Sequence, residues 1–181
     1  HDNHSLWDKL SIANAGSNQE ERAAMNRLGA AILMISRGTP FFQAGEEMLR
    51  TKPKADGTFD ENSYKSSDAI NNINWSALST DSDEYKMMTF YKSLIRLRKT
   101  YGIFTTLNTA VSATDLKDGR YAVTIDNHIG GKAMIIINPT GEAMTYTASG
   151  SWNMLSDGEN VNVDSPVAVS GDISISAYSA I

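Results

Sequence analysis

The sequence of 181 residues contains no cysteine, which excludes disulfide bonds and zinc sites built from thiolates. Positive charge is also scarce, because 16 Lys and Arg residues stand against 21 Asp and Glu, a formal net charge of -5. This balance, without a basic cluster, argues against binding to nucleic acids or anionic membranes. The best apolar run, Ala30 to Ile35, is far too short to span a bilayer. No secretion signal is visible, but a chain that begins within a motif could not show one, so localisation stays open.

The most informative residues are the first three, His1-Asp2-Asn3, which are followed by apolar Leu6 and Trp7. A carboxylate and an imidazole can hold sugar hydroxyls beside an aromatic platform, so this set suits a carbohydrate site. Because the chain starts on these residues, we expect a site that is cut in half and completed by a preceding segment. A His-Asp pair is also common in surface turns and helix caps, so other segments must support this interpretation.

The first half of the chain has helical periodicity. A helix is predicted from about residue 18 to 37, with Ser17 and Glu20 as a capping box and Gly38 as its stop. The short apolar run at 40–45, PFFQAG, then predicts a buried strand. A helix, a tight turn and a buried strand in this order form half of an α/β unit, as in a parallel sheet or barrel.

An irregular segment follows from about residue 48 to 80, and it carries two lone aromatic residues, Tyr64 and Trp75. Loops of this length are usually functional or disordered, and the aromatic and amide side chains favour a binding loop. A second helix is predicted from about residue 81 to 101, with an acidic start and a basic end that complement the helix dipole. Its apolar face comprises Met87, Phe90, Leu94, Leu97 and Tyr101.

From Ile103 onward, short alternating segments separated by turn residues predict an antiparallel β-sandwich. The continuously apolar segment 133–137 predicts a central strand, and pairs such as Asp118-Gly119 predict the turns. The alternating apolar residues are Tyr121, Val123 and Ile125, then Met144 and Tyr146, then Ile173 and Ile175.

Three stretches resemble segments of the α-amylase superfamily (glycoside hydrolase family 13). The run 1–10, HDNHSLWDKL, resembles the segment after the family's seventh barrel strand, and the run 38–47, GTPFFQAGEE, resembles its eighth strand. The run 62–68, NSYKSSD, and then NNINW at 71–75, resemble the loop after that strand in type I pullulanases. The whole chain is thus similar to the C-terminal part of such an enzyme.

The resemblance implies a fold of α/β plus all-β type. Residues 1–102 would be the last βα units of an incomplete (β/α)8 barrel, and residues 103–181 an antiparallel β-sandwich domain. Active sites of such barrels lie at the C-terminal ends of the strands, where the first residues and the loop would meet. With barrel strands missing, we expect the helical half to be partly disordered, rearranged or a non-native dimer, and the β-half to fold independently. The missing N-terminal barrel portion would be its partner.

The implied activity is retaining hydrolysis of α-1,6-glucosidic bonds in pullulan, starch or glycogen-type glucans. It needs a carboxylate nucleophile and a carboxylic acid about 5–5.5 Å apart, and the family supplies both from other strands. We therefore expect no hydrolysis from this chain alone. Asp2 would stabilise the cationic transition state, and His1 would bind hydroxyls of the same glucose unit. Trp7, Asn62 and Tyr64 would contact the substrate, a branched α-glucan.

Some residues keep a second interpretation. Trp7 suits a core position as well as a sugar platform. Glu46 and Glu47 would point to opposite faces of the predicted strand, with Glu47 accepting backbone N–H groups. Arg50 and Lys52 are expected to pair with carboxylates of the loop.

Two alternatives stay open for the function. The first is another member of the same superfamily, an isoamylase or an α-amylase. The second is a non-catalytic carbohydrate-binding or scaffolding module, with Trp152 and Tyr146 as its platform. Asn62 also suits an ordinary turn. No cofactor or metal-ligand set is indicated, and a calcium requirement, the oligomeric state and what precedes His1 stay open.

Overall fold

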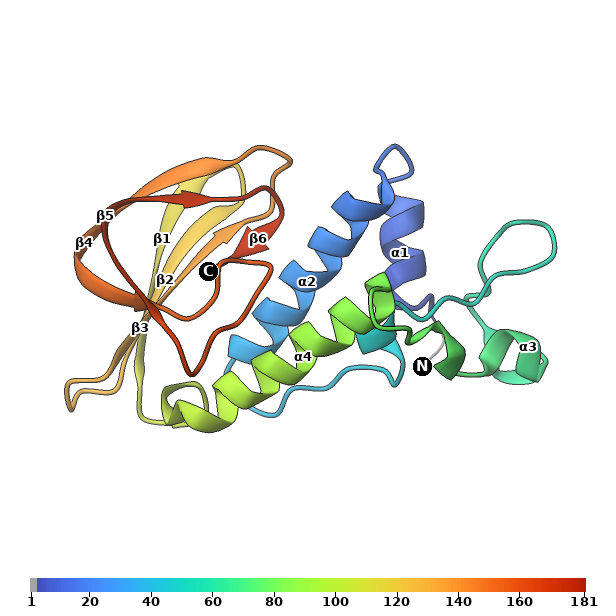
Figure 1. Cartoon of the computed structure of the whole chain (residues 1–181), viewed down its shortest axis with the longest axis horizontal. Helices are drawn as coiled ribbons and strands as arrows, with labels where there is room; N and C mark the ends of the chain where they lie inside the picture. The colour runs from blue at the N-terminus through green and yellow to red at the C-terminus, as the bar shows by residue number, and fades with distance from the viewer. Residues whose placement is uncertain (1–2) are drawn as a thin grey trace.

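A computed structural model describes residues 3–181. Two antiparallel sheets form one end of the molecule, two long helices run through the middle, and a loop segment forms the other end (Figure 1). The long helices are α2 (Gln19–Ile35) and α4 (Asp83–Thr100), and the short α1 (Leu6–Ala13) lies beside α2. No helix in this part of the chain is long and apolar enough to cross a membrane.

Helix α2 confirms the first predicted helix but begins with a different cap. The side chain of Asn18 accepts a hydrogen bond from the backbone of Glu21, whose carboxylate accepts one from the backbone of Asn18. The predicted box of Ser17 and Glu20 is therefore wrong by one residue. Asn caps helices as well as Ser does, and the Ser17 hydroxyl instead donates to the carbonyl of Asn14.

The predicted buried strand at 40–45 is wrong. The segment is irregular with a turn at residues 44–45, forms no β-ladder with any described residue, and leaves Phe41 77% exposed. A strand needs a neighbour for its N–H and C=O groups, and no other strand lies in this half of the described chain. The 3-10 helix η1 (Glu46–Met48) follows, so Glu46 and Glu47 lie on one helical turn rather than on opposite faces of a strand.

The loop segment that follows contains three short helical turns: η2 (Ser63–Lys65), α3 (Asp68–Asn71) and η3 (Trp75–Ala77). Helix α4 then begins at the N-cap Ser82, confirming the second predicted helix, and η4 (Gly102–Phe104) follows it. Met87, Phe90, Leu94 and Leu97 are buried as predicted, and Tyr101 is half-buried just after the helix.

The second half confirms the predicted antiparallel strands. One sheet has the order β1 (Ala110–Lys117), β2 (Arg120–Asp126), β3 (Lys132–Asn138) and β6 (Ser179–Ala180), so the apolar strand β3 is central as predicted. The other sheet pairs β4 (Met144–Met154) with β5 (Val167–Ile175). Asp118 and Gly119 both have positive φ in the turn between β1 and β2, as a type I′ turn requires.

The hydrophobic core crosses from the helices to the sheet. One cluster joins Met34 of α2 and Leu97 of α4 to Phe104, Ile135 and Ala180. A second cluster lies between the two sheets and contains Ile136, Ala148, Ile173 and Ile175. The helices are therefore anchored on the sheet, which leaves the loop segment at the far end of the molecule.

Candidate functional site

The centre of the candidate site is the buried carboxylate of Asp8, on the first turn of α1. Ser5 caps this helix by accepting the Asp8 backbone N–H at 3.3 Å. One carboxylate oxygen accepts the Thr51 hydroxyl at 2.5 Å, and the other accepts the Lys52 backbone N–H at 2.9 Å. A buried charge is tolerated only when hydrogen bonds satisfy it, and here both oxygens have donors. Asp8 thereby fixes the start of the loop segment against α1.

Lys52 extends this connection to the first described residue. Its side chain is buried, at 2% exposure for the residue, and its Nζ donates to the carbonyl of Asn3 at 2.9 Å and to Ser63 Oγ at 3.3 Å. Among residues 3–181, no carboxylate lies within 4.0 Å of this ammonium group. The predicted pairing of Lys52 with a loop carboxylate is therefore wrong, because a carbonyl and a hydroxyl oxygen accept its protons instead.

Arg50 also binds carbonyl groups rather than the predicted carboxylates. Its guanidinium donates to Ala44 O at 3.2 Å and to Asn71 O at 2.5 Å, which joins the residues before the loop segment to the end of α3. The Asn71 amide donates in turn to Ser63 O at 2.6 Å. Gly45 is required beside it, since its φ is +93° and an added Cβ would lie 2.7 Å from the Arg50 side chain.

Asp60 stabilises the same loop by accepting hydrogen bonds from other loop residues. It accepts the Ser66 hydroxyl at 2.5 Å and the Asn62 backbone N–H at 3.1 Å. The Ser66 hydrogen bond is the main cause that lowers the pKa of Asp60 below its ordinary value of 3.8, with the Asn62 N–H acting in the same direction. The segment is thus cross-linked by its own polar groups, although it is long and irregular.

The structure places the residues predicted to touch substrate as follows. His1 and Asp2 lie outside the described residues. Trp7 is half-buried against the core, with the Arg22 guanidinium 5.7 Å from its ring centroid. Asn62 is exposed at the start of η2, and Tyr64 is 71% exposed with the Lys65 ammonium 5.2 Å from its ring centroid.

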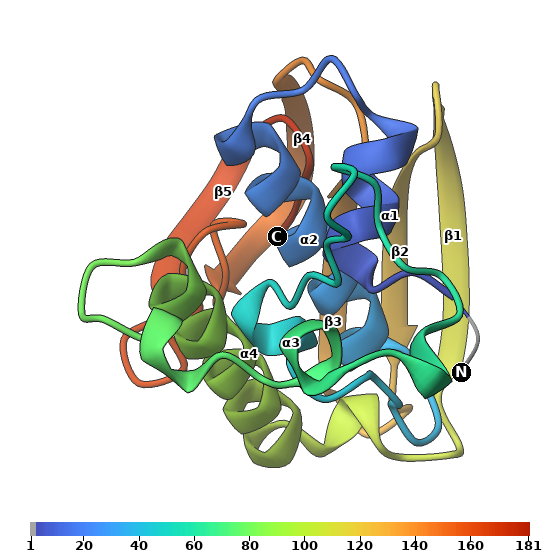
Figure 2. The same cartoon turned by 90° about the vertical axis from the view of Figure 1, so that its right-hand side faces the viewer.

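Lys52 contacts residues that neighbour the predicted site residues in the sequence. Asn3 directly follows Asp2, and Ser63 lies between Asn62 and Tyr64, so the Lys52 ammonium group joins the two segments that the sequence singled out. Figure 2 faces this end of the molecule and shows the loop segment lying in front of α1 and α2. Trp7 faces the core instead and does not share these contacts.

The acidic pair at η1 takes part in packing contacts. The buried Tyr91 hydroxyl donates to Glu46 at 2.8 Å, and burial together with the Glu46 carboxylate raises the pKa of Tyr91 above its ordinary value. Glu47 accepts the Gly45 backbone N–H at 2.9 Å, which confirms its predicted role as a backbone acceptor. No group of three or more metal-binding side chains is present among residues 3–181.

Sequence reasoning missed Asp8 and misjudged Lys52, which hold the site together. The one available signal was the spacing of Ser5 and Asp8, which is typical of a helix N-cap. Nothing in the spacing revealed that Asp8 would be buried or that its partners lie more than 40 residues away.

Comparisons with known proteins agree with the resemblance. No protein-family model matches the chain. The pullulanase of Bacillus subtilis (strain 168) is 35% identical over 129 residues, which are 71% of this chain and 16% of that protein. An isoamylase of Pseudomonas amyloderamosa is 33% identical over 95 residues, 52% of this chain and 11% of that protein.

Solved structures extend the match to nearly the full chain. The pullulanase from Bacillus acidopullulyticus superposes with a TM-score of 0.85 and 28% identity, over 99% of this chain and 22% of that one. The chain spans about a sixth of the first curated relative and about a quarter of these solved chains. It corresponds to the C-terminal part of a pullulanase-type enzyme.

Proposed function

We propose that this chain supplies the transition-state-stabilising side of a debranching site for α-1,6-glucosidic bonds. Relatives named pullulanase and isoamylase support a debranching glycoside hydrolase. The observation that carries the proposal is the Lys52 ammonium group, which binds both the Asn3 carbonyl and Ser63 Oγ. It holds the segment after Asp2 beside the loop that presents Asn62 and Tyr64.

The proposed mechanism retains the anomeric configuration. The nucleophile and the general acid, about 5–5.5 Å apart, would come from outside this chain, so the chain alone would not hydrolyse glucans. Asp2 would act as a pre-placed anion opposite the positive charge that develops on the sugar ring. His1 would donate to hydroxyls of the same glucose unit.

The loop would add binding contacts on the same side. Tyr64 offers an exposed ring for stacking against a sugar, and Asn62 offers an exposed amide. Trp7 supports the site indirectly, since its half-buried position in the core favours packing over direct stacking.

The proposed fold places this site at the mouth of a barrel. Residues 1–102 would contribute the last βα units of a (β/α)8 barrel, and the segment at 40–45 would become a strand beside the missing N-terminal barrel portion. Residues 103–181 would form the all-β domain, a sandwich of the two sheets. Limited proteolysis tests this division: we expect early cleavage in the exposed loop near Lys54 and persistence of the β-half. Preferential loss of residues beyond 103 would contradict it.

Substitution of Asp2 tests the proposed chemistry in the longer protein that carries this chain. Asp2→Asn removes the anion, so hydrolysis of pullulan should fall about 10²–10³-fold, as when one transition-state-stabilising group is removed elsewhere. Affinity for maltotriose should change only a few-fold. Asp56→Asn, in the exposed turn of the same loop, is the matched control. Near-normal activity of Asp2→Asn would refute the assigned role.

The non-catalytic alternative has less support. Trp152 is half-buried in the cluster between the sheets, with its indole N–H bound to Ser149 O at 2.9 Å, and Tyr146 packs against the same cluster. Both rings therefore contribute to packing rather than form an open platform. Glucan binding by the chain that is lost in Trp152→Ala, with folding retained, would favour this alternative.

A further inference from the structure

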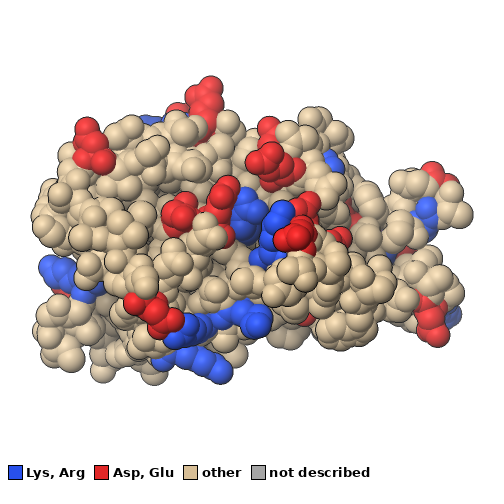
Figure 3. Space-filling model, viewed as in Figure 1, with Lys and Arg blue, Asp and Glu red and all other residues tan. Residues whose placement is uncertain are grey.

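A groove distinct from the candidate site runs between α2, α4 and the loop at 159–162. Its volume is about 830 Å³, within the range of roughly 300–1,000 Å³ that small-molecule sites occupy. Figure 3 shows basic side chains flanked by acidic ones in the middle of the face that α2 and α4 form. The side chains that line the groove and carry its chemistry are Glu20, Arg27, Tyr85, Glu159, Asn160 and Asn162.

Buried residues form the floor of this groove, and a hydrogen bond fixes one of its ends. Ala23 of α2 and Phe90 of α4 are buried in the shared core beneath it. At one end the Gln19 amide donates to Asp83 at 2.7 Å, which joins the starts of the two helices. The groove is therefore largely preformed, and a ligand would not have to order its walls.

The chemistry of the walls fits a neutral polyhydroxylated ligand. Three carboxylates, those of Glu20, Asp83 and Glu159, face two cations, Arg27 and Lys86, so the lining has little net charge and selects no strong anion. Carboxylates accept hydrogen bonds from hydroxyl groups, a guanidinium donates to them, and amides do both. Tyr85 is 42% exposed and adds an aromatic face against which a sugar ring can stack.

Arg27 and Glu159 lie near each other in the groove lining without a direct hydrogen bond. The exposed Glu159 carboxylate is 3.8 Å from Arg27 Nη2, a distance longer than a hydrogen bond. A sugar hydroxyl in the groove could accept a hydrogen bond from Nη2 and donate one to Glu159, which would bridge the two side chains.

We propose that this groove is a second binding site for a linear α-glucan, separate from the debranching site. The choice of an α-glucan rests on the proposed function, whereas the groove shares no residue with the Asp8 and Lys52 contacts. A branched substrate could thus be held at two places on one molecule, which raises its effective concentration at the catalytic site.

Calorimetric titration of the 181-residue chain with maltotriose tests this proposal. We expect binding that weakens at least tenfold in Tyr85→Ala, which removes the stacking face. Arg27→Lys should weaken it similarly, because it keeps the charge but removes the Nη2 donor beside Glu159. Tyr121→Ala, a tyrosine on β2 with a similar exposure of 41% that lies outside the groove, is the matched control and should leave this binding unchanged. Cellotriose, with β-linkages, should bind much more weakly.

Three results would overturn the proposal. The first is no binding of maltotriose at millimolar concentration. The second is unchanged affinity in both Tyr85→Ala and Arg27→Lys, with circular dichroism showing that they fold. The third is loss of binding in Tyr64→Ala alone, which would place the sugar at the candidate site and leave the proposed function intact. Conversely, binding that depends on Tyr85 would support the second site even if Asp2→Asn kept full activity in the longer protein, so the two proposals can fail separately.

Discussion

The carboxylate of Asp8 accepts the hydroxyl of Thr51 at 2.5 Å, across 43 residues of sequence. This contact and the neighbouring bond to the Lys52 backbone secure the loop segment on α1. The arrangement of the candidate site therefore depends on an anion that lies beneath it and that no substrate would touch.

Removal of this anion should destabilise the protein. In Asp8→Ala the buried Lys52 N–H loses its acceptor, which costs about 1–3 kcal/mol, whereas the hydroxyl of the exposed Thr51 can bind water instead. Urea unfolding should show a lower free energy of unfolding. Asp56→Ala removes an exposed carboxylate that binds only Thr58 nearby, so its effect should be smaller. Equal losses in the two variants would show that burial of Asp8 carries no special weight.

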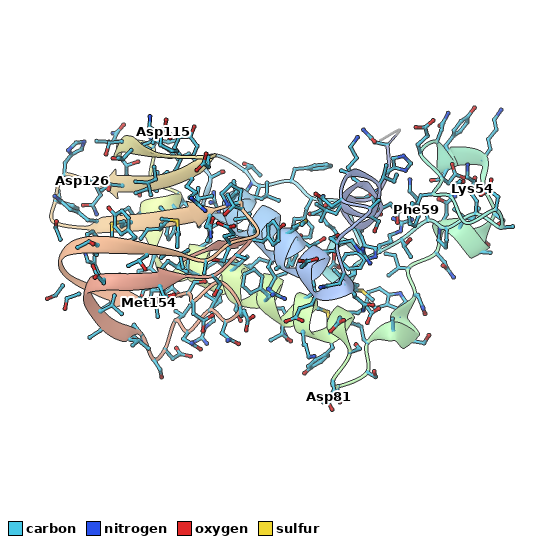
Figure 4. The ribbon with its side chains drawn as sticks, turned by 90° about the horizontal axis from the view of Figure 1, so that it is seen from above. Lys54, Phe59, Asp81, Asp115, Asp126 and Met154 are labelled. Atoms are coloured by element: carbon cyan, nitrogen blue, oxygen red, sulfur yellow. The ribbon has the colours of Figure 1, made fainter. Side chains whose placement is uncertain are left out.

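The Lys52 ammonium group should hold the loop in place without adding much stability. Lys52→Met keeps the volume and removes a costly buried charge, so the free energy of unfolding should change little. The bonds to Asn3 and Ser63 are lost, however, and amide hydrogen exchange in residues 60–66 should become faster. Lys54→Met is the control, because Lys54 lies in the projecting loop with Phe59, far from the sheet residues Asp115 and Asp126 (Figure 4). Unchanged exchange at Ser63 in Lys52→Met would rule out this tether.

Asp60 should make the protein less stable in acid. Its pKa is lowered in the folded state, chiefly by the Ser66 hydrogen bond, so the folded chain binds this proton less readily than the unfolded chain. The stabilisation is present above the ordinary value of 3.8 and is lost as pH falls through the lower folded value. As the pH falls from neutral to about pH 3, the free energy of unfolding should therefore decrease more in the wild type than in Asp60→Asn. Parallel pH curves for the two proteins would contradict this.

Arg98 and Arg96 provide a matched pair for the end of α2. Buried Arg98 donates to Met34 O at 2.5 Å and Ser36 O at 2.7 Å, and also to Gly38 O, so it satisfies carbonyls that the helix end leaves free. Arg98→Met should lower the free energy of unfolding by about 2 kcal/mol, because hydrogen bonds to charged groups are strong. Exposed Arg96 pairs with Asp164 on the surface, and Arg96→Met should cost less than about 1 kcal/mol. Thermal unfolding of both variants measures the difference, and the reverse order would refute this assignment.

The helices and strands were predictable because each follows from a local pattern. Met87, Phe90, Leu94 and Leu97 lie on one face of α4 whatever surrounds it, and the run at 133–137 forms a central strand. The cap of α2 was harder, since Ser17 and Asn18 are both good N-caps and the sequence does not decide between them.

The errors concern features that depend on distant partners. The run at 40–45 has the composition of a buried strand, but a strand is completed only by a neighbour, and the described chain offers none there. Lys52 was expected to seek a carboxylate, yet its place in the fold brings carbonyl and hydroxyl oxygens to its Nζ. Local spacing could not reveal either outcome.

The hydrogen bonds beside the segment at 40–45 have one more consequence. Arg98 donates to Gly38 O and Arg50 donates to Ala44 O, so the backbone is held to the described fold on both sides of this segment. A strand that paired with it would meet a backbone whose flanks are already fixed, and less conformational entropy would be lost on this side than with a free segment.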